Sequence, residues 1–393
     1  NENIISNNSV ENLVRLSRKS WNSDINLIVE HKSYKSNTHQ LLSKTTLKKP
    51  FVADEIQKEY LWKKEFPTGV RMLFSIKNHR TNVNEILIQD KQNTLHLLDL
   101  NGEIRWSISL EEEIIGGVSQ IDIFKNGKLQ VLFNTASKLY LIDVLGRDLD
   151  GFPIKLSSDA TNQAMALDYE KTKDYRILVA TQNGILNYNI EGKKVKGFSF
   201  SQPNLIIQNP IRHFALGGLD YICFNDSKGK PHYLNRKGEE RFKSEVLYSS
   251  SDIFNTFKKS SSMPLSKVYM LNTDGMLSEG GLSSLSNLVV KDSSILKTLS
   301  VSNTSKSKKY LIGLGDRFLN IYTPSGNLIR EITCDFEPKR VGFEIVNGQE
   351  GKLLVLSKTN ELYVFDLYQD KFTDVFHNVT ANQIVKDFDM DGL

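Results

Sequence analysis

Three carboxylates near the end of the chain have the spacing of a calcium-binding loop. Asp387, Asp389 and Asp391 alternate with apolar residues and are followed by Gly392. Carboxylate oxygens are the ligands that Ca²⁺ prefers, and a glycine permits the sharp turn that brings alternate side chains to one ion. The sequence lacks a downstream ligand that would complete such a site. Two interpretations therefore stay open, a calcium site and a solvated acidic turn.

The other residues that could do chemistry lack the spacing that catalysis or metal binding requires. The seven histidines are scattered and form no HExxH motif or other metal-binding spacing. There is no G-x-S-x-G, no P-loop and no G-x-G-x-x-G after a strand. The pairs Gly217-Gly218 and Gly280-Gly281 are expected to lie in turns. We therefore expect that the protein is not an enzyme, and we expect no cofactor apart from the Ca²⁺ considered above.

The composition is that of an ordinary globular protein. The chain has 393 residues, of which 39% are hydrophobic and 24% are charged. Its net charge of +4 is too small to indicate nucleic acid or an anionic membrane as the partner. No stretch of about 18 apolar residues predicts a membrane span. Cys223 and Cys334 form no CxxC pair and are expected to be buried free thiols.

An internal repeat shows which elements would position these residues. A short apolar strand, a tight turn and a second strand recur with a period of about 44 residues. The interval between the fourth and fifth of the clear turns is twice this period, and a degraded copy of the repeat covers residues 272–281. Tyrosines that recur in the repeat strand are expected to pack between neighbouring units. The turns lie at Gly102, Gly146, Gly192, Gly238, Gly326 and Asp370, and the tyrosines are Tyr140, Tyr188, Tyr233, Tyr322 and Tyr363.

This period predicts an all-β fold, a β-propeller. Another apolar run precedes each turn phrase, and three or four strands per repeat make one blade. We expect about eight four-stranded blades, with the ring closed by strands from both ends of the chain. Residues 59–64 would be the outermost strand of the closing blade and residues 384–389 its first strand. Residues 1–59 are expected to be a stub of a separate N-terminal domain or a strap, and residues 60–393 the propeller, whose closing blade is incomplete. The apolar runs are residues 85–88, 129–133, 176–180, 310–313 and 353–356.

Several of these segments resemble known propeller families. Residues 139–153 and 192–198 resemble quinoprotein-like repeats of the outer-membrane-assembly type, and Asp387 to Gly392 resembles the calcium loops of integrin-type repeats. Large envelope propeller proteins of Bacteroidetes-type bacteria are similar to this chain over roughly residues 60–393, and the resemblance is carried by residues 86–90, 126–135, 167–169 with 174–176, and 234–238. This resemblance implies a periplasmic, outer-membrane-associated location and no enzymatic activity. It also implies a subunit of a large complex, such as a plug of the type IX secretion translocon.

Two classes of function follow from these observations. The first is a non-catalytic scaffold that binds a large protein partner, peripheral to the membrane and without nucleic acid. The alternative is a ligand- or quinone-binding propeller, similar to an oxidoreductase, that uses the central channel. A quinone cofactor needs aromatic stacking and convergent charged groups, whereas the three tryptophans, Trp21, Trp62 and Trp106, are scattered. The degraded repeat around residues 260–294 is expected to be exposed, flexible or shaped by a partner.

Overall fold

The regular elements of the protein are β-strands throughout the part that is described. The computed structural model describes residues 2–8, 13–19, 26–31, 59–202, 205–207, 209–241, 257–258, 265–271, 274–281, 289–303, 309–346, 349–376 and 385–387. Within these ranges no helix is long and apolar enough to cross a membrane. The chain forms two compact units. One contains Asn1–Ile76, Asn82–Ser109 and Phe376–Leu393, and the other contains Lys77–Thr81 and Leu110–Val375.

Strands from both ends of the chain share one sheet in the first unit. Its order is β31 (Val385–Asp387), β3 (Asn26–His31), β1 (Glu2–Asn8), β2 (Leu13–Lys19) and β4 (Glu59–Glu65). β3 pairs antiparallel with β31 and parallel with β1, and β4 lies at the opposite edge. The expectation that strands from the two ends pair in one sheet is thereby confirmed. The domain boundary at residue 59 stays a prediction.

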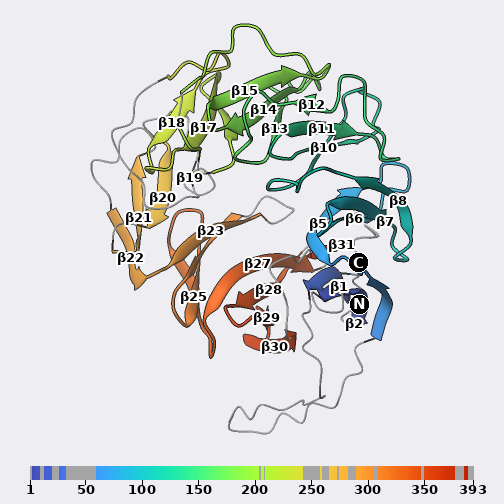
Figure 1. Ribbon diagram of the computed structural model, residues 1–393. Helices are drawn as coiled ribbons and strands as arrows, with labels where there is room; N and C mark the ends of the chain where they lie inside the picture. Colours follow the sequence, from blue (N-terminus) through green and yellow to red (C-terminus); the bar gives the residue numbers. More distant parts are fainter. Residues whose placement is uncertain are drawn as a thin grey trace. The chain divides into compact units, whose positions relative to one another are not determined.

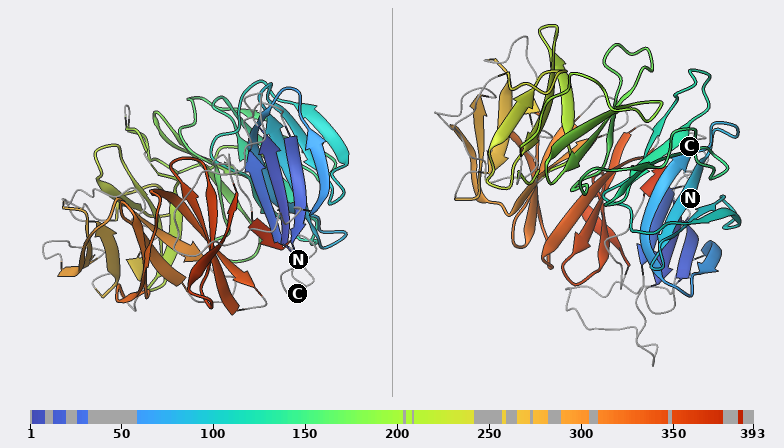
Figure 2. Two further views of the ribbon diagram at one scale, coloured as in Figure 1. Left: turned by 90° about the horizontal axis from the view of Figure 1, so that it is seen from below. Right: turned by 45° about the horizontal axis from the view of Figure 1, so that its top comes forward.

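Seven further sheets follow one another in chain order within the described residues, and we number them accordingly. Within each of these sheets, strands that are consecutive in the chain are hydrogen-bonded neighbours. Sheets 2 to 7 belong to the second unit, where they lie side by side along a curved row (Figures 1 and 2). Sheet 1 is β5 (Val70–Lys77), β6 (Asn84–Asp90), β7 (Thr94–Leu98) and β8 (Ile104–Ser109); sheet 2 is β9 (Ser119–Ile121), β10 (Gln130–Asn134), β11 (Lys138–Ile142) and β12 (Ile154–Lys155); sheet 3 is β13 (Met165–Leu167), β14 (Arg176–Thr181) and β15 (Gly184–Asn189); sheet 4 is β16 (Arg212–Leu216), β17 (Leu219–Asn225) and β18 (Pro231–Leu234). Sheet 5 is β19 (Phe257–Lys258), β20 (Lys267–Leu271), β21 (Met276–Gly281) and β22 (Val289–Ile295); sheet 6 is β23 (Thr298–Asn303), β24 (Lys309–Leu314), β25 (Phe318–Tyr322) and β26 (Leu328–Thr333); sheet 7 is β27 (Pro338–Val346), β28 (Gln349–Ser357), β29 (Leu362–Asp366) and β30 (Lys371–Phe376).

The hydrophobic core lies between consecutive sheets. In β14, Ile177 and Val179 pack against sheet 2, whereas Leu178 between them packs against sheet 4. Because alternate side chains of a strand point to opposite faces, each middle strand is buried on both sides and its sequence is a continuous apolar run. The apolar runs predicted from the sequence correspond to β6, β10, β14, β24 and β28.

The recurring turn has the same hydrogen bonds in successive sheets. In sheet 2 the Asp143 carboxylate accepts the N–H groups of Leu145 and Arg147, at 2.8 and 3.0 Å. Asn189 in sheet 3 repeats this pattern. The residue three positions after each of these side chains has a φ near +75°, a conformation that glycine adopts without strain. The predicted glycine turns at residues 102, 146, 192, 238 and 326 all have this φ, and Asp370 has a φ of +52°.

Three expectations about the repeats need correction or stay open. Gly280 and Gly281 are not in a turn, because β21 pairs with β20 through both residues. Sheet 3 has three strands, since the segment after Gly192 touches β15 only at two isolated bridges and bends at Gly197, whose φ is +81°. The doubled interval after Gly238 implies a further turn one period later, near residue 282, and this position lies outside the described residues.

Candidate interaction surface

Two loops of the second unit are built on the same plan. Residues 122–129 join β9 to β10, and residues 168–175 join β13 to β14. The carboxylate of Asp122 accepts the N–H groups four and five residues later, at 3.1 and 2.9 Å. Asp168 accepts the corresponding N–H groups, at 3.0 and 2.8 Å. Each loop is therefore closed by one aspartate at its first position. We call residues 122–129 and 168–175 together the loop pair.

The backbone of the loop pair is also repeated. Lys125 and Gly127 have φ values of +55° and +81°, and their counterparts Lys171 and Lys173 have φ values of +58° and +64°. A lysine at such a φ is strained, whereas glycine is not. Lys173 thus adopts a conformation that a glycine occupies in the preceding loop, and its side chain makes a contact that glycine cannot make.

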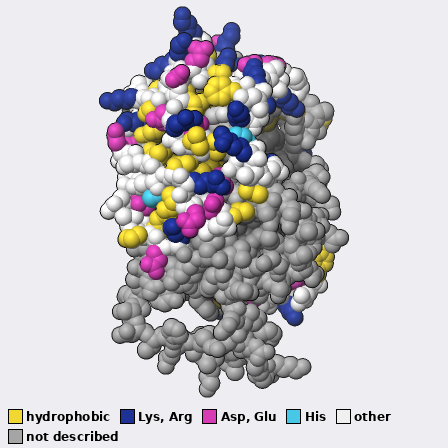
Figure 3. All heavy atoms as spheres, turned by 90° about the vertical axis from the view of Figure 1, so that its right-hand side faces the viewer, with side chains coloured by type: hydrophobic (Ala, Val, Ile, Leu, Met, Phe, Trp, Pro, Cys, Tyr) yellow, Lys and Arg dark blue, Asp and Glu magenta, His cyan; other side chains and the backbone are white. Residues whose placement is uncertain are grey.

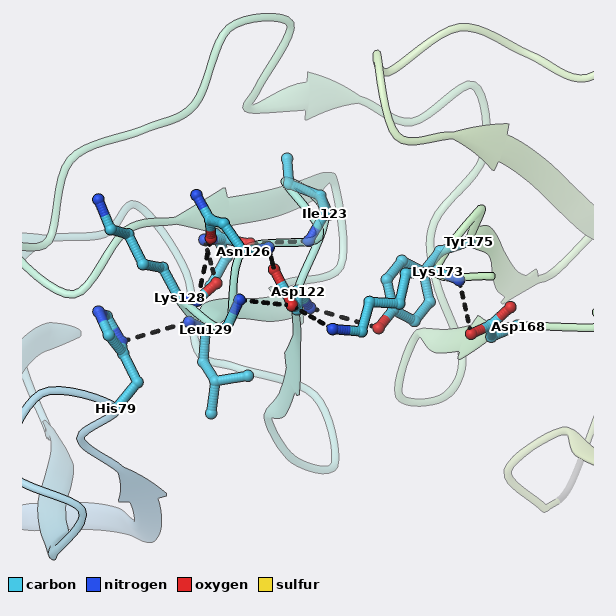
Figure 4. A network of polar contacts seen from close by, with 11 residues as sticks. His79, Asp122, Ile123, Asn126, Lys128, Leu129, Asp168, Lys173 and Tyr175 are labelled. Carbon is cyan, nitrogen blue, oxygen red and sulfur yellow. Dashed lines mark hydrogen bonds and ion pairs between the residues drawn. The ribbon is translucent and has the colours of Figure 1, made fainter. Parts of the chain in front are cut away.

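That contact joins the two loops. The Lys173 ammonium donates to the carboxylate of Asp122 at 2.5 Å, and the N–H of Asp122 donates to the hydroxyl of Tyr175 at 3.3 Å (Figure 4). Lys125 and Asp174 form a second ion pair at 2.6 Å. Burial of the Asp122 side chain, which is 5% exposed, acts to raise its pKa. The hydrogen bonds from Lys173 and from the loop N–H groups outweigh burial and hold the pKa below its ordinary value.

Further contacts hold the loop pair on both sides. On one side the N–H of Leu129 donates to Nδ1 of His79 at 3.2 Å (Figure 4), and the amide of Gln120 bonds both backbone groups of Lys77. On the other side Arg236 pairs with Glu170 and with Asp220, and its guanidinium lies 4.5 Å from the centre of the Tyr169 ring. The loops are therefore fixed by contacts to the elements before and after them.

The fixed loops present an aromatic ring and cations to solvent. Phe124 is 60% exposed, and Lys128 and Lys171 are exposed. Lys and Arg side chains stand among apolar ones over the described part of the face in Figure 3. Exposed apolar residues also occur at the outer edges of sheets 5 and 6, namely Val289, Val290 and Ile295 of β22 and Leu328 and Ile329 of β26.

Two of the three carboxylates predicted to bind calcium lie outside the described residues. Asp387 ends β31, and Asp389 and Asp391 lie outside the described residues, so this site stays a prediction. In the ranges given above, no group of at least three His, Cys, Asp or Glu residues could hold a metal ion.

Two histidines of the repeat strands have equivalent structural contacts. His232 is buried, with Nδ1 at 2.7 Å from Glu240 and Nε2 at 3.4 Å from Asp226. His96 makes the same 3.4 Å contact to Asp90, which is also six residues earlier. Asp90 and Asp226 each accept two N–H groups of their own hairpin turn, so the imidazoles pack against turn-forming carboxylates. Both imidazoles therefore contribute to packing within their sheets.

Cys223 and Cys334 are buried free thiols, as predicted. Burial raises the pKa of Cys223 well above its ordinary value and that of Cys334 to about 12. Neither thiol is therefore a nucleophile at neutral pH.

The sequence interpretation missed the loop pair. A signal was present, because Asp122 and Asp168 each follow an aliphatic residue, Ile121 and Leu167, and are one repeat apart. The alternating carboxylates of a calcium loop are absent from both segments, so that pattern does not identify a loop closed by a single aspartate.

The comparisons with known proteins concern the fold. No family model matches the sequence, and no curated protein matches it. The structure of BamB from Moraxella catarrhalis is similar with a TM-score of 0.51 and 16% identity, over 81% of this chain and 97% of that chain. The C-terminal WD40 domain of Sif2 has a TM-score of 0.54 and 14% identity, over 92% and 95% of the two chains. The dihydro-heme d1 dehydrogenase NirN in complex with DHE has a TM-score of 0.55 and 12% identity, over 84% and 70%. These neighbours are β-propellers, which confirms the predicted fold class; the number of blades stays a prediction.

Proposed function

We propose that this β-propeller protein is a non-catalytic scaffold whose loop pair binds a large protein partner. The observation that carries the proposal is the exposed ring of Phe124 on a loop held by Asp122 and Lys173. A side chain on a fixed loop loses little conformational entropy when it is bound, and aromatic anchors contribute much of the free energy of an interface. Solvent exposure of a phenyl ring is unfavourable in the free protein, so contact with a partner would be stabilising.

The finer form of the proposal places the scaffold in a bacterial envelope complex. The supporting observation is the resemblance of residues 86–90, 126–135 and 234–238 to large envelope propeller proteins. On this basis the protein is periplasmic and outer-membrane associated, and it blocks or gates the periplasmic side of the type IX secretion translocon. The loop pair, which includes part of the second of these segments, would then face the translocon.

Purification from native membranes tests this function. The wild-type protein, a Phe124→Ala variant and an Ile329→Ala variant are cross-linked in cells, purified and analysed by mass spectrometry. Ile329 is 49% exposed on β26, away from the loop pair, and is the matched control. We expect one large complex for the wild-type and Ile329→Ala proteins and a reduced yield for Phe124→Ala. Recovery of the wild-type protein only as a free monomer would contradict the proposed function.

A further inference from the structure

We propose that the partner contacts the loop pair through an acidic segment that carries an apolar side chain. This inference rests on the proposed function and names the chemistry of the partner. It follows from a comparison of the charges that the loops satisfy internally with those that they leave to solvent.

The carboxylates of the loop pair are already bound within the protein. Asp122 and Asp168 close their loops through pairs of N–H groups, so each carboxylate already accepts two backbone hydrogen bonds. The remaining carboxylates of the two loops, and Asp122 as well, form ion pairs. The ion pairs are Asp122 with Lys173, Asp174 with Lys125, and Glu170 with Arg236.

Three cations on or next to the loop pair have no carboxylate partner among the described residues. Lys128 and Lys171 are exposed, and neither has a carboxylate partner among the described residues. Arg80 is also exposed and without such a partner there, and it follows His79, the residue that contacts Leu129 of the first loop. Figure 4 shows His79 bonded to Leu129, the residue after Lys128. The charge that remains for a partner is therefore positive on both loops.

The apolar part of the surface lies between these cations in the sequence. Phe124 is next to Lys125 and four residues before Lys128, on the same closed loop. A partner that covers the ring must offer apolar surface, and one that approaches the three cations must offer carboxylates or other anions. An extended protein segment that combines Asp or Glu with a Leu or Phe meets both requirements.

A nucleic acid is the less suitable polyanion. Single-stranded nucleic acids bind to successive aromatic side chains within a continuous basic groove. The loop pair offers one exposed phenyl ring, and Lys125 and Lys173 are already engaged by carboxylates. We therefore assign the surface to an acidic protein segment, and nucleic acid becomes an outcome of the test.

The experiment measures peptide binding by the purified full chain. The probes are a dye-labelled peptide of alternating Glu and Leu, the same peptide with Gln in place of Glu, and a labelled single-stranded DNA, each followed by fluorescence anisotropy. The test variants are Phe124→Ser and a double variant, Lys128→Glu with Lys171→Glu. The control is Lys228→Glu with Lys196→Glu, which changes the net charge equally at two exposed lysines outside the loop pair. Circular dichroism verifies that each variant is folded.

We expect the Glu peptide to bind and the Gln peptide to bind much more weakly. The double variant in the loops should weaken binding of the Glu peptide by at least about tenfold, and the control by no more than about twofold, because only close charges contribute strongly. Phe124→Ser should weaken binding of both peptides.

Other outcomes overturn the inference. These are equal binding of the two peptides, no binding of the Glu peptide, equal effects of the two double variants, or preferential binding of the DNA. If any of them is found while the wild-type protein is still purified from native membranes in a large complex, the scaffold function stands and only the acidic nature of the partner is wrong.

Discussion

The Lys173 ammonium is bonded to the buried carboxylate of Asp122, although the two residues are 51 positions apart in the chain. The same carboxylate accepts the N–H groups of Asn126 and Gly127 and so also determines the conformation of its own loop. One aspartate therefore closes a loop of sheet 2 and joins it to sheet 3. The exposed Phe124 lies within that loop, so the link between the sheets also fixes the candidate interaction surface.

We expect Asp122→Ala to destabilise the protein by about 1 to 3 kcal/mol, because N–H groups in a partly buried loop and an ammonium group lose their acceptor. Asp168→Ala is the matched control, since it opens the equivalent loop but leaves Lys173 bonded to Asp122. Urea unfolding followed by fluorescence measures both. An effect of Asp122→Ala no larger than that of Asp168→Ala would show that the link between the loops adds nothing to stability.

Glu337 provides a prediction about pH. Its carboxylate accepts hydrogen bonds from Lys297 and Lys358, at 2.6 and 2.5 Å, and these bonds, led by that from Lys297, lower the pKa from 4.5 to about 2. A carboxylate whose pKa is lower in the folded state stabilises the protein above its ordinary pKa. This stabilisation is lost as the pH falls from about 4.5 toward 2.

The measurement is a carbon-detected NMR titration of the Glu337 carboxyl group. Lys297→Met should raise the pKa of Glu337 toward its ordinary value, and Lys358→Met should raise it less, because the hydrogen bond from Lys297 is the larger influence. If neither variant moves the titration midpoint, the ion pairs do not exist in solution.

Gly151 is predicted to tolerate a side chain less well than Gly197. Its φ is +85°, and a Cβ added there would lie 2.5 Å from the backbone oxygen of Glu191. Gly197, one repeat later, has a φ of +81° and nothing within 4 Å of an added Cβ. Gly197→Ala should therefore cost about 1 kcal/mol from backbone strain alone. Gly151→Ala should cost clearly more, because the clash is with main-chain atoms that cannot move without shifting the neighbouring turn. Thermal and urea unfolding compare the two; equal losses would contradict the close approach.

The features that the sequence predicted are those that depend on local pattern. Apolar runs identified the buried strands, and the glycine at residue 146 or 192 identified a turn, because a run of residues or a positive φ reflects its immediate neighbours. The presence of β4 and β31 in one sheet was accessible for another reason, since the repeat register identified residues 59–64 and 384–389 as strands of one closing blade.

The features that could not be predicted depend on distant partners. A glycine pair usually indicates a turn, yet Gly280 and Gly281 are held in β21 by pairing with β20. Lys173 adopts a positive φ that its residue type disfavours, and it is held there by its ion pair with Asp122 and by the bond from its N–H to Asp168. Both outcomes are set by hydrogen bonds to another strand or loop, which no local pattern contains.

The last prediction concerns the hydroxyl of Tyr322, which joins sheets 5 and 6. Tyr322 is fully buried in β25, and its hydroxyl donates to the carboxylate of Asp292 in β22 at 2.7 Å. Burial, and then this hydrogen bond, raise the pKa of Tyr322 well above its ordinary value. Tyr322→Phe should destabilise the protein by about 1 to 2 kcal/mol, because it removes a hydrogen bond to a charged group and leaves the ring packing unchanged.

Tyr188→Phe is the matched control for this change. Tyr188 is the equivalent residue of sheet 3 and is also buried, but its hydroxyl makes no hydrogen bond to any described residue. Its replacement should change the free energy of unfolding by less than about 0.5 kcal/mol. Urea unfolding of the two variants side by side separates the hydrogen bond from the packing of the ring, and equal losses would mean that the contact between Tyr322 and Asp292 does not hold the two sheets together.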